Sequence, residues 1–399
     1  MKKMIIGYFI YAIFMGLYLF VVAPSGISPE FSGSAADPET FMAPGQLAAS
    51  WIFSRSRHLL FFLSPPFEWL AIYFFMLKSA RIKARVQARV PWKRIQVPAY
   101  YLMFASFIFL CLLPFRLFNF GLARYFGTSV MTLPHWLLNR GIDFVVDFIL
   151  ILFIIQALLF LMGKFKDRWW VAAGLAFIPF AFFFMLVQPV LIDPLYSDFY
   201  PLQDAGLEER IVGMAQDAGI SAERVFKVRM SDRTNLINGY VTGVGPTARI
   251  VIWDTALEQL SEDEVLFLMA HEIAHYVYRD VYRGIGVAIV FVFGGLFILH
   301  LVFKRWDADR FKQIPLGMLT ASMLMFAASP MTNAISRRME IRADQFAMDA
   351  TQDPQAGIGL FQKLNTASLN EVHPPGLVRF FRSTHPTIFE RLTTLLDFE

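Results

Sequence analysis

Two histidines and a glutamate stand at a spacing that can hold a metal ion, in the run Met269-Ala-His-Glu-Ile-Ala-His-Tyr276. Residues four apart on a helix lie one turn above each other, so His271 and His275 can direct imidazole nitrogens at one cation. Glu272 lies beside that face and can take a proton from a water molecule next to the cation. This His-Glu-x-x-His pattern is typical of zinc hydrolases, and its alternative is a chance match on an amphipathic helix.

A third ligand is needed, because a catalytic zinc ion usually has three protein ligands and a fourth position open to water. Glu340 is the best candidate, and Asp344, one turn later, can accept the free N–H of a ligand histidine. From the residues alone, a solvated helix face with charged (i, i+4) pairs explains Glu340 and Asp344 better. The single cysteine, Cys111, lies inside an apolar run, so a zinc site here must use nitrogen and oxygen ligands.

The elements that position these residues belong to a membrane protein. Of the 399 residues, 56% are hydrophobic and 17% are charged, against roughly 25% charged in soluble domains, and the mean hydropathy is +0.49. This composition indicates an integral membrane protein that contacts membrane lipids. The net charge of +4 is small, and no basic patch interleaved with aromatic residues suggests a nucleic-acid partner.

Seven apolar stretches are long enough to cross a bilayer as helices, for which about 20 residues are needed. They are Met4–Ala23, His58–Lys78, Val97–Phe118, Ile142–Gly163, Trp169–Ile192, Val281–Phe303 and Ile314–Asn333. We expect a mainly α integral membrane protein with about seven transmembrane helices. Residues 1–192 then form an N-terminal membrane region with five spans. Residues 193–399 form the region of the metal motif and include the last two spans, at about 281–303 and 314–333.

One long stretch of soluble character, Asp193–Asp280, separates the fifth span from the sixth. Its pattern predicts a small β-sheet and an amphipathic helix, with strands Val225–Met230, Gly239–Thr242 and Arg249–Trp253 and helix Leu207–Ala218. A capping box at Ser261–Glu264 marks the start of the metal-binding helix. No proline or glycine interrupts the chain from Ser261 to Tyr282. We therefore expect that helix to run almost straight into the sixth span, with the metal at the membrane surface.

Outside these elements, the polar segment from Pro24 to Arg57 is predicted to be a loop, since it is rich in glycine, proline and serine. The C-terminal tail is predicted to contain a helix at Ala356–Leu369 and a final helix after Pro386.

The second half of the chain resembles the Ste24-type CAAX prenyl proteases (type I) of the M48 metallopeptidase family. Downstream of the histidine motif, the resemblance rests on Asn333-x-x-Ser336-Arg337-x-x-Glu340-x-x-Ala343-Asp344. Four further pieces occur in the family's order: Asp193–Leu202, Asn238-Gly-Tyr240, Ile250–Thr255, and Ser383-Thr-His-Pro386 followed by Glu390-Arg391. The first half agrees in span number and hydrophobicity.

The resemblance implies roles for particular residues. His271, His275 and Glu340 would bind one zinc ion per chain, Glu272 would be the general base, and Asp344 would support a ligand histidine. His385 and Arg391 would stabilise the developing oxyanion and the site, although without the family His385 is better explained as a helix-capping histidine. Family members also enclose the site in a chamber formed by seven helices.

The segment Asn238–Thr242 has two interpretations. The resemblance implies that Asn238, Gly239 and Tyr240 lie on the substrate side of the site, where a strand can pair with an extended peptide. The residues themselves are equally consistent with an ordinary hairpin edge.

The implied function is peptide-bond hydrolysis by an integral-membrane zinc metalloendopeptidase. Its substrate would be a peptide or protein, lipidated in the eukaryotic relatives, although no residue here specifies a prenyl pocket. The alternatives are an HtpX-like quality-control protease, which has fewer spans, and an intramembrane site-2-type protease, whose third ligand is an aspartate. A non-catalytic scaffold or transporter is the remaining possibility.

Charge placement indicates the orientation in a bacterial-type cell membrane. The even-numbered connections between spans and the N-terminus carry most of the lysines and arginines, above all the segment 78–94. The positive-inside rule therefore predicts a cytoplasmic N-terminus and a metal-binding region outside the cytoplasm. The eukaryotic relatives face the other way, so resemblance and charge rule disagree on this point.

Overall fold

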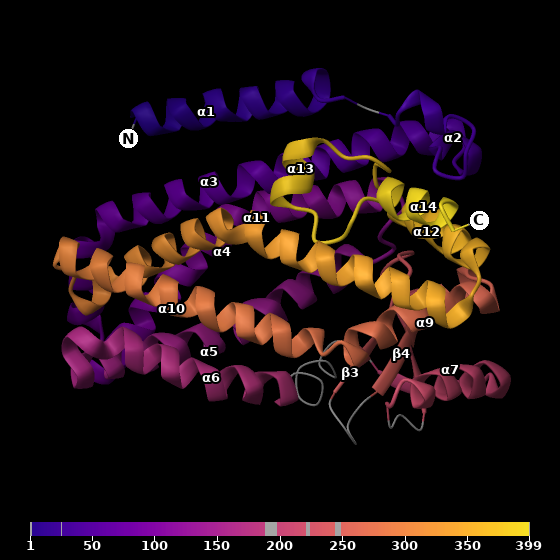
Figure 1. Ribbon diagram of the computed structural model, residues 1–399. Helices are drawn as coiled ribbons and strands as arrows, with labels where there is room; N and C mark the ends of the chain where they lie inside the picture. Colours follow the sequence, from indigo (N-terminus) through magenta and orange to yellow (C-terminus); the bar gives the residue numbers. More distant parts are fainter. Residues whose placement is uncertain (1, 25, 188–197, 221–223, 244–248, 399) are drawn as a thin grey trace.

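The computed structural model describes residues 2–24, 26–187, 198–220, 224–243 and 249–398. Long helices lie side by side through most of the molecule, and the short helices and the strands gather at one end (Figure 1). The predicted boundary between residues 192 and 193, the end of the fifth span and the first part of the Asp193–Leu202 motif lie outside the described residues.

Among the described residues, six helical stretches are long and apolar enough to cross a membrane. One of them, Leu133–Val187, contains two helices that turn back on each other at Lys166, where φ is 47° (Figure 1). The helices of the six stretches are α1 (Lys2–Leu17), α3 (Pro44–Arg89), α4 (Lys93–Tyr125), α5 (Leu133–Phe165), α6 (Trp169–Val187), α10 (Asp280–Trp306) and α11 (Arg310–Thr351). With this hairpin counted as two, the described helices agree with the predicted membrane fold of about seven spans.

Two of these helices, α3 and α11, are much longer than the apolar stretch that each contains. The expected loop from Pro24 to Arg57 is wrong from Pro44 onward, because Pro44 begins α3, and its first turns bury Phe53 and Arg55 against other parts of the chain. Helix α11 has 42 residues and continues through Pro330 to Thr351. One continuous helix therefore carries Glu340 out of the membrane, so its position is tied to the packing of the bundle.

The strands form a single mixed sheet in the order β1-β2-β4-β3, made of β1 (Phe199–Pro201), β2 (Val225–Val228), β3 (Gly239–Thr242) and β4 (Arg249–Trp253). β2 and β4 are parallel, and the other two pairs are antiparallel. Because β3 is the last strand in this order, it lies at an edge of the sheet. The three predicted strands are confirmed. The predicted helix corresponds to α7 (Ala205–Asp217), and α8 (Asp254–Gln259) follows β4.

The motif lies on α9 (Glu262–Val277), which begins at the predicted capping box. Ser261 Oγ accepts from the N–H of Glu264, and the Glu264 carboxylate accepts from the N–H of Ser261. Phe267, Met269 and Ile273 are fully buried, because α9 packs between β3, α7, α11 and α12 (Pro354–Ser368). Such a helix holds its side chains in fixed positions.

Helix α9 does not continue into α10, so the expected straight run into the sixth span is wrong. Arg279 adopts a left-handed conformation, with φ of 54°, and α10 starts at the next residue. A non-glycine residue in this region costs on the order of 1–3 kcal/mol and persists only where its surroundings hold it. Those surroundings are the ion pairs of Asp280, whose carboxylate contacts His275, Arg283 and Arg342.

A buried arginine joins the two ends of the chain. The side chain of Arg55 is fully buried, and its Nε lies 2.7 and 2.8 Å from the two carboxylate oxygens of Glu371. Its Nη1 and Nη2 donate to the backbone carbonyls of Leu19 and Pro24, just after α1. The C-terminal tail, with α13 (Gly376–Phe381) and α14 (Ile388–Leu396), is thereby attached to the first membrane helices.

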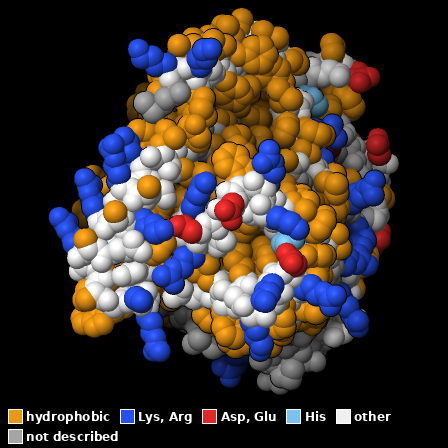
Figure 2. All heavy atoms as spheres, turned by 90° about the vertical axis from the view of Figure 1, so that its left-hand side faces the viewer, with side chains coloured by type: hydrophobic (Ala, Val, Ile, Leu, Met, Phe, Trp, Pro, Cys, Tyr) orange, Lys and Arg blue, Asp and Glu red, His pale blue; other side chains and the backbone are white. Residues whose placement is uncertain are grey.

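Lysines and arginines collect at the end of the bundle opposite the sheet. Figure 2 shows them around the rim of that end, where the α3–α4, α5–α6 and α10–α11 connections lie. They are Lys78, Arg81, Lys83, Arg85, Arg89, Lys93, Arg94, Lys164, Lys166, Arg168, Lys304, Arg305, Arg310 and Lys312. The N-terminal helix begins at this same end (Figure 1). The basic connections and the metal motif are therefore at opposite ends of the bundle.

Candidate metal centre

Three side chains from α9 and α11 converge on one point. The Nε2 atoms of His271 and His275 are 3.3 Å apart, and they lie 3.2 and 3.5 Å from the two carboxylate oxygens of Glu340. The candidate ligand atoms of these residues all lie within 4.8 Å of one another. The structure thus brings together the three residues predicted as metal ligands, and a solvated charged face is wrong for Glu340, which is 6% exposed.

The chemistry of the cluster fits a cation. Each Nδ1 is occupied, that of His271 by Asp344 at 2.9 Å and that of His275 by Asp280 at 3.0 Å. A carboxylate can only accept, so both Nδ1 atoms carry the proton, and in the neutral rings the Nε2 lone pairs face each other and Glu340. Glu340 Oε2 is also buried without a hydrogen-bond partner. Two nitrogens and a carboxylate suit zinc.

The pKa of His271 is raised, which shows that the surrounding carboxylates favour a positive charge at this position. Burial alone lowers it, but the carboxylates of Asp344 and Glu340 beside the ring outweigh burial and raise the pKa to about 9. Without a metal, a proton on Nε2 satisfies Glu340. A divalent cation held by these residues would take the place of this proton.

Asp344 and Arg391 lie behind His271. Arg391 Nε donates to Asp344 Oδ2 at 2.9 Å, its Nη2 donates to Asp344 Oδ1, and the guanidinium lies 3.9 Å from the centroid of the Phe361 ring. Asp344 thus lies between the ring of His271 and the guanidinium of Arg391, at the position where it was predicted to support a ligand histidine. Arg391 Nη2 also lies 3.5 Å from His271 Nδ1, so the guanidinium packs behind the ring.

Asp280 supports His275 in the same way, and sequence reasoning missed it. Arg342 and Arg283 both contact Asp280 Oδ1, and the Arg342 guanidinium lies 4.1 Å from the centroid of the Tyr278 ring. In an uninterrupted helix, residues five apart point in different directions, so Asp280 reaches His275 only because the helix breaks at Arg279. No proline or glycine signals that break.

We expect Asp280→Ala to weaken zinc binding about 10–100-fold, the usual cost of losing a hydrogen-bond partner of a metal-binding histidine. The affinity would be measured by competition with a chromogenic chelator. Asp349→Ala, at an exposed position near the end of α11, is the matched control. Equal affinities of the two variants would contradict the role given to Asp280.

His385 reaches the centre from the connection between α13 and α14. Its Nε2 lies 3.3 Å from Glu340 Oε2, while 58% of its side chain remains exposed. Arg337 of α11 donates to the carbonyl oxygens of Arg379 and Ser383, at 3.1 and 2.7 Å, and so holds this connection. The N-cap of α14 is Thr387, so the helix-capping explanation of His385 is wrong.

Glu272 lies on the same helix as both histidines, and burial raises the pKa of its carboxyl group above the ordinary value. A glutamate with a raised pKa is a stronger base once ionised, which suits proton transfer near neutral pH.

The edge strand β3 packs directly on α9. Gly239 is buried, and a Cβ there would come within 3.1 Å of Met269 Sδ and 3.4 Å of the Val251 carbonyl oxygen. Asn238 is exposed and its carbonyl oxygen accepts from Trp253 N at 3.0 Å. The predicted substrate segment is thus an edge strand beside the metal-binding helix, a position that fits either of its interpretations.

A membrane-spanning helix bundle that carries a His/His/Glu metal centre at one end defines a class, the integral-membrane metallopeptidases. The family model for peptidase family M48 matches residues 201–399, and the model for the CAAX prenyl protease N-terminal region, five membrane helices, matches residues 53–198. The metalloprotease YhfN of Bacillus subtilis is 34% identical over 97% of this chain and 94% of its own length. The chain belongs to peptidase family M48 and is of the Ste24 type.

Other relatives are named as CAAX prenyl proteases. CAAX prenyl protease 1 of Saccharomyces cerevisiae is 25% identical, covering 69% of this chain and 66% of the yeast protein. The homolog of Oryza sativa is 29% identical over 53% of this chain and 52% of its own length. The crystal structure of S. mikatae Ste24p has the same fold, with a TM-score of 0.81, 21% identity, and coverage of 99% of this chain and 97% of that one.

Proposed function

We propose that this membrane metalloprotease hydrolyses peptide bonds with one zinc ion held by His271, His275 and Glu340. The observation that supports this assignment is the convergence of these three side chains beside Glu272. When bound, the ion supplies Lewis acidity, which polarises the scissile carbonyl and makes water a stronger acid.

The residues of the chain supply the remaining functions. Glu272 takes the proton of the attacking water and delivers it to the leaving amine. His385, exposed and close to Glu340, donates to the developing oxyanion, and a donor of this kind is worth about 2.7–4 kcal/mol. Arg391 and Asp344 hold His271 in position. Asn238, Gly239 and Tyr240 present the backbone of an edge strand to an extended substrate.

The substrate is a peptide or protein, and an apolar groove supports a lipidated one. The groove, of about 640 Å³, lies between α10 and α11, and its lining runs from Gly284 to Leu299 and from Thr320 to Met339. The last residue of its lining, Met339, directly precedes Glu340 in α11. A lipid chain that lay in the groove would therefore leave an attached peptide near the metal centre.

Metal removal tests the function. The purified protein is expected to contain about one zinc ion per chain and to cleave an unstructured peptide. We expect 1,10-phenanthroline to stop the cleavage and added zinc to restore it. A protein that binds no zinc, or cleavage that persists after the metal is removed, would favour the scaffold or transporter.

The orientation follows from the basic rim in Figure 2. Because positively charged connections stay in the cytoplasm, we propose that the region 193–399 has its metal centre on the opposite side of a bacterial-type cell membrane. A reporter that is active only in the cytoplasm, fused after Glu399, is expected to be silent. The same reporter inserted into the segment 78–94 is expected to be active, and an active C-terminal fusion would reverse the orientation.

A further inference from the structure

The last turns of α3 carry a row of positive charges along one face. Lys78, Arg81, Arg85 and Arg89 follow one another at intervals of three or four residues, so they lie in line on the helix surface, and all four are exposed. We call this row the basic stripe. Val86, on a different face of the same turns, is 5% exposed and packs against α4 and α11. The basic stripe therefore lies on the outside of the bundle.

The basic stripe has no negative charge beside it to neutralise it. The chain contains no aspartate or glutamate between Glu68 and Asp143. Among the described residues, the segment 78–94 makes a single ion pair, between Lys83 and Asp309, and no residue of the basic stripe takes part in it. Four positive charges within about 17 Å of helix repel one another, so they favour an anionic partner.

The face of α3 that carries the basic stripe is apolar one to two turns earlier. Phe74 precedes Arg81 by seven residues and Leu77 precedes it by four, which places both on the face of Arg81. Their side chains are 41% and 53% exposed, and they belong to a helix long and apolar enough to cross a membrane. In a bilayer, exposed apolar side chains of a spanning helix contact acyl chains. The basic stripe begins where this contact ends.

The dimensions suit a layer of lipid headgroups. This layer is roughly 5–8 Å thick on each side of the hydrocarbon core, and the helical turn from Arg81 to Arg85 advances about 6 Å. The long side chains of arginine extend the reach of the basic stripe along the surface. Trp92, in the connection between α3 and α4, is 68% exposed, and tryptophan is enriched at membrane–water interfaces. The end of α3 therefore has the features of an interfacial segment.

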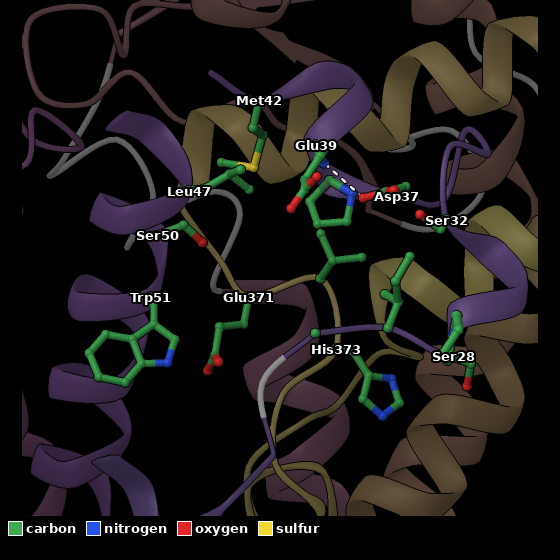
Figure 3. Close-up of a pocket in the computed structure, with 15 residues that line it drawn as sticks. Ser28, Ser32, Asp37, Glu39, Met42, Leu47, Ser50, Trp51, Glu371 and His373 are labelled. Carbon is green, nitrogen blue, oxygen red and sulfur yellow. Dashed lines mark hydrogen bonds between the residues drawn. The ribbon is translucent and has the colours of Figure 1, made fainter. Parts of the chain in front are cut away.

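The opposite end of the bundle does not offer the same environment. There, the connection between α1 and α3 borders a cavity of about 430 Å³, drawn in Figure 3, with Asp37 and Glu39 in its wall. No lysine or arginine occurs among the described residues that line it. An anionic headgroup is disfavoured beside these carboxylates and favoured beside the basic stripe.

We propose that the basic stripe binds the headgroups of anionic phospholipids, whose acyl chains lie against Phe74 and Leu77. The phosphate oxygens accept hydrogen bonds from the guanidinium groups of Arg81, Arg85 and Arg89. The partner is the lipid of the surrounding bilayer, and its attraction to the basic stripe weakens as the salt concentration rises. The metal centre lies at the other end of the bundle, so the absence of lipid binding would leave the peptidase function untouched.

The experiment measures which lipids the whole chain retains in detergent, by native mass spectrometry after addition of equal amounts of dioleoylphosphatidylglycerol and dioleoylphosphatidylcholine. The wild type is expected to retain the anionic lipid about tenfold over the zwitterionic one. The combined variant Arg81→Gln, Arg85→Gln and Arg89→Gln is expected to lower this ratio to about threefold or less, because only the other basic connections then contribute. A wild type that retains both lipids equally would overturn the proposal.

The matched control combines Arg210→Gln, Arg224→Gln and Arg229→Gln, three exposed arginines at the end of the bundle that carries the sheet. It loses the same charge and should keep the wild-type ratio. An equal fall in both triple variants would show that net charge alone sets the preference, and would overturn the proposal. Displacement of the bound lipid by inorganic phosphate at constant ionic strength would also overturn it, because the basic stripe would then be a site for a soluble anion.

A photoactivatable phosphatidylglycerol gives a second readout on the wild type, which does not depend on the folding of any variant. Its crosslinks, mapped by mass spectrometry of peptide fragments, are expected to concentrate between residues 74 and 94. Crosslinks spread evenly over the membrane helices would contradict a specific headgroup site on α3.

Discussion

Glu272→Gln is expected to lower kcat for peptide hydrolysis about 10²–10⁴-fold, because an amide cannot accept the proton of the attacking water. The variant should retain its zinc, since the ligand atoms belong to His271, His275 and Glu340. The measurement is single-turnover cleavage of a fluorogenic peptide, together with zinc content and thermal unfolding in detergent. Loss of activity without loss of metal separates a chemical role from a structural one.

The matched control for this variant is Glu262→Gln, an exposed glutamate in the first turn of the same helix that pairs with Arg210. It should cleave at close to the wild-type rate. A Glu272→Gln variant that matched this control would exclude the general-base mechanism.

Glu340→Ala is expected to lower zinc affinity about 100-fold or more, beyond the effect of losing an outer hydrogen-bond partner, and to abolish hydrolysis. Two histidines then remain, with neither a third ligand nor the carboxylate charge that favours a cation between them. Zinc affinity would be measured by chelator competition and activity by peptide cleavage.

Glu258→Ala, an exposed glutamate on α8, is the control and should behave as the wild type does. Full zinc affinity in Glu340→Ala would show that another residue supplies the third ligand. That result would favour a site-2-type arrangement, in which an aspartate has this role.

The parts of this site that follow from local spacing could be predicted from the sequence. His271 and His275 face the same way because the helix places them there, and the capping box sets where that helix begins. The membrane helices are predictable for a similar reason, since a bilayer demands long apolar segments. Glu340 and Asp344 needed the family resemblance, because nothing in their own spacing tells that α11 packs against α9.

The features that sequence reasoning missed depend on contacts between distant residues. The break at Arg279 exists because Asp280 is held by Arg342, which comes from another helix. The polar composition of Pro24–Arg57 predicts a loop, whereas the structure has the first turns of α3 from Pro44 onward. In the fold, Arg55 and Ser54 instead donate to the C-terminal tail, at Glu371 and Leu369. Polar composition predicts exposure only where no distant partner is available.

The ion pair between Arg55 and Glu371 has a consequence for the order in which the protein folds during synthesis. Residue 55 leaves the ribosome long before residue 371, and Arg391, which fixes Asp344 and through it His271, is translated later still. An unfinished polypeptide therefore lacks a completed catalytic centre, however many of its helices have already been inserted. We therefore expect a polypeptide that stops before Arg391 to hold Asp344, and through it the ring of His271, less firmly than the full sequence does.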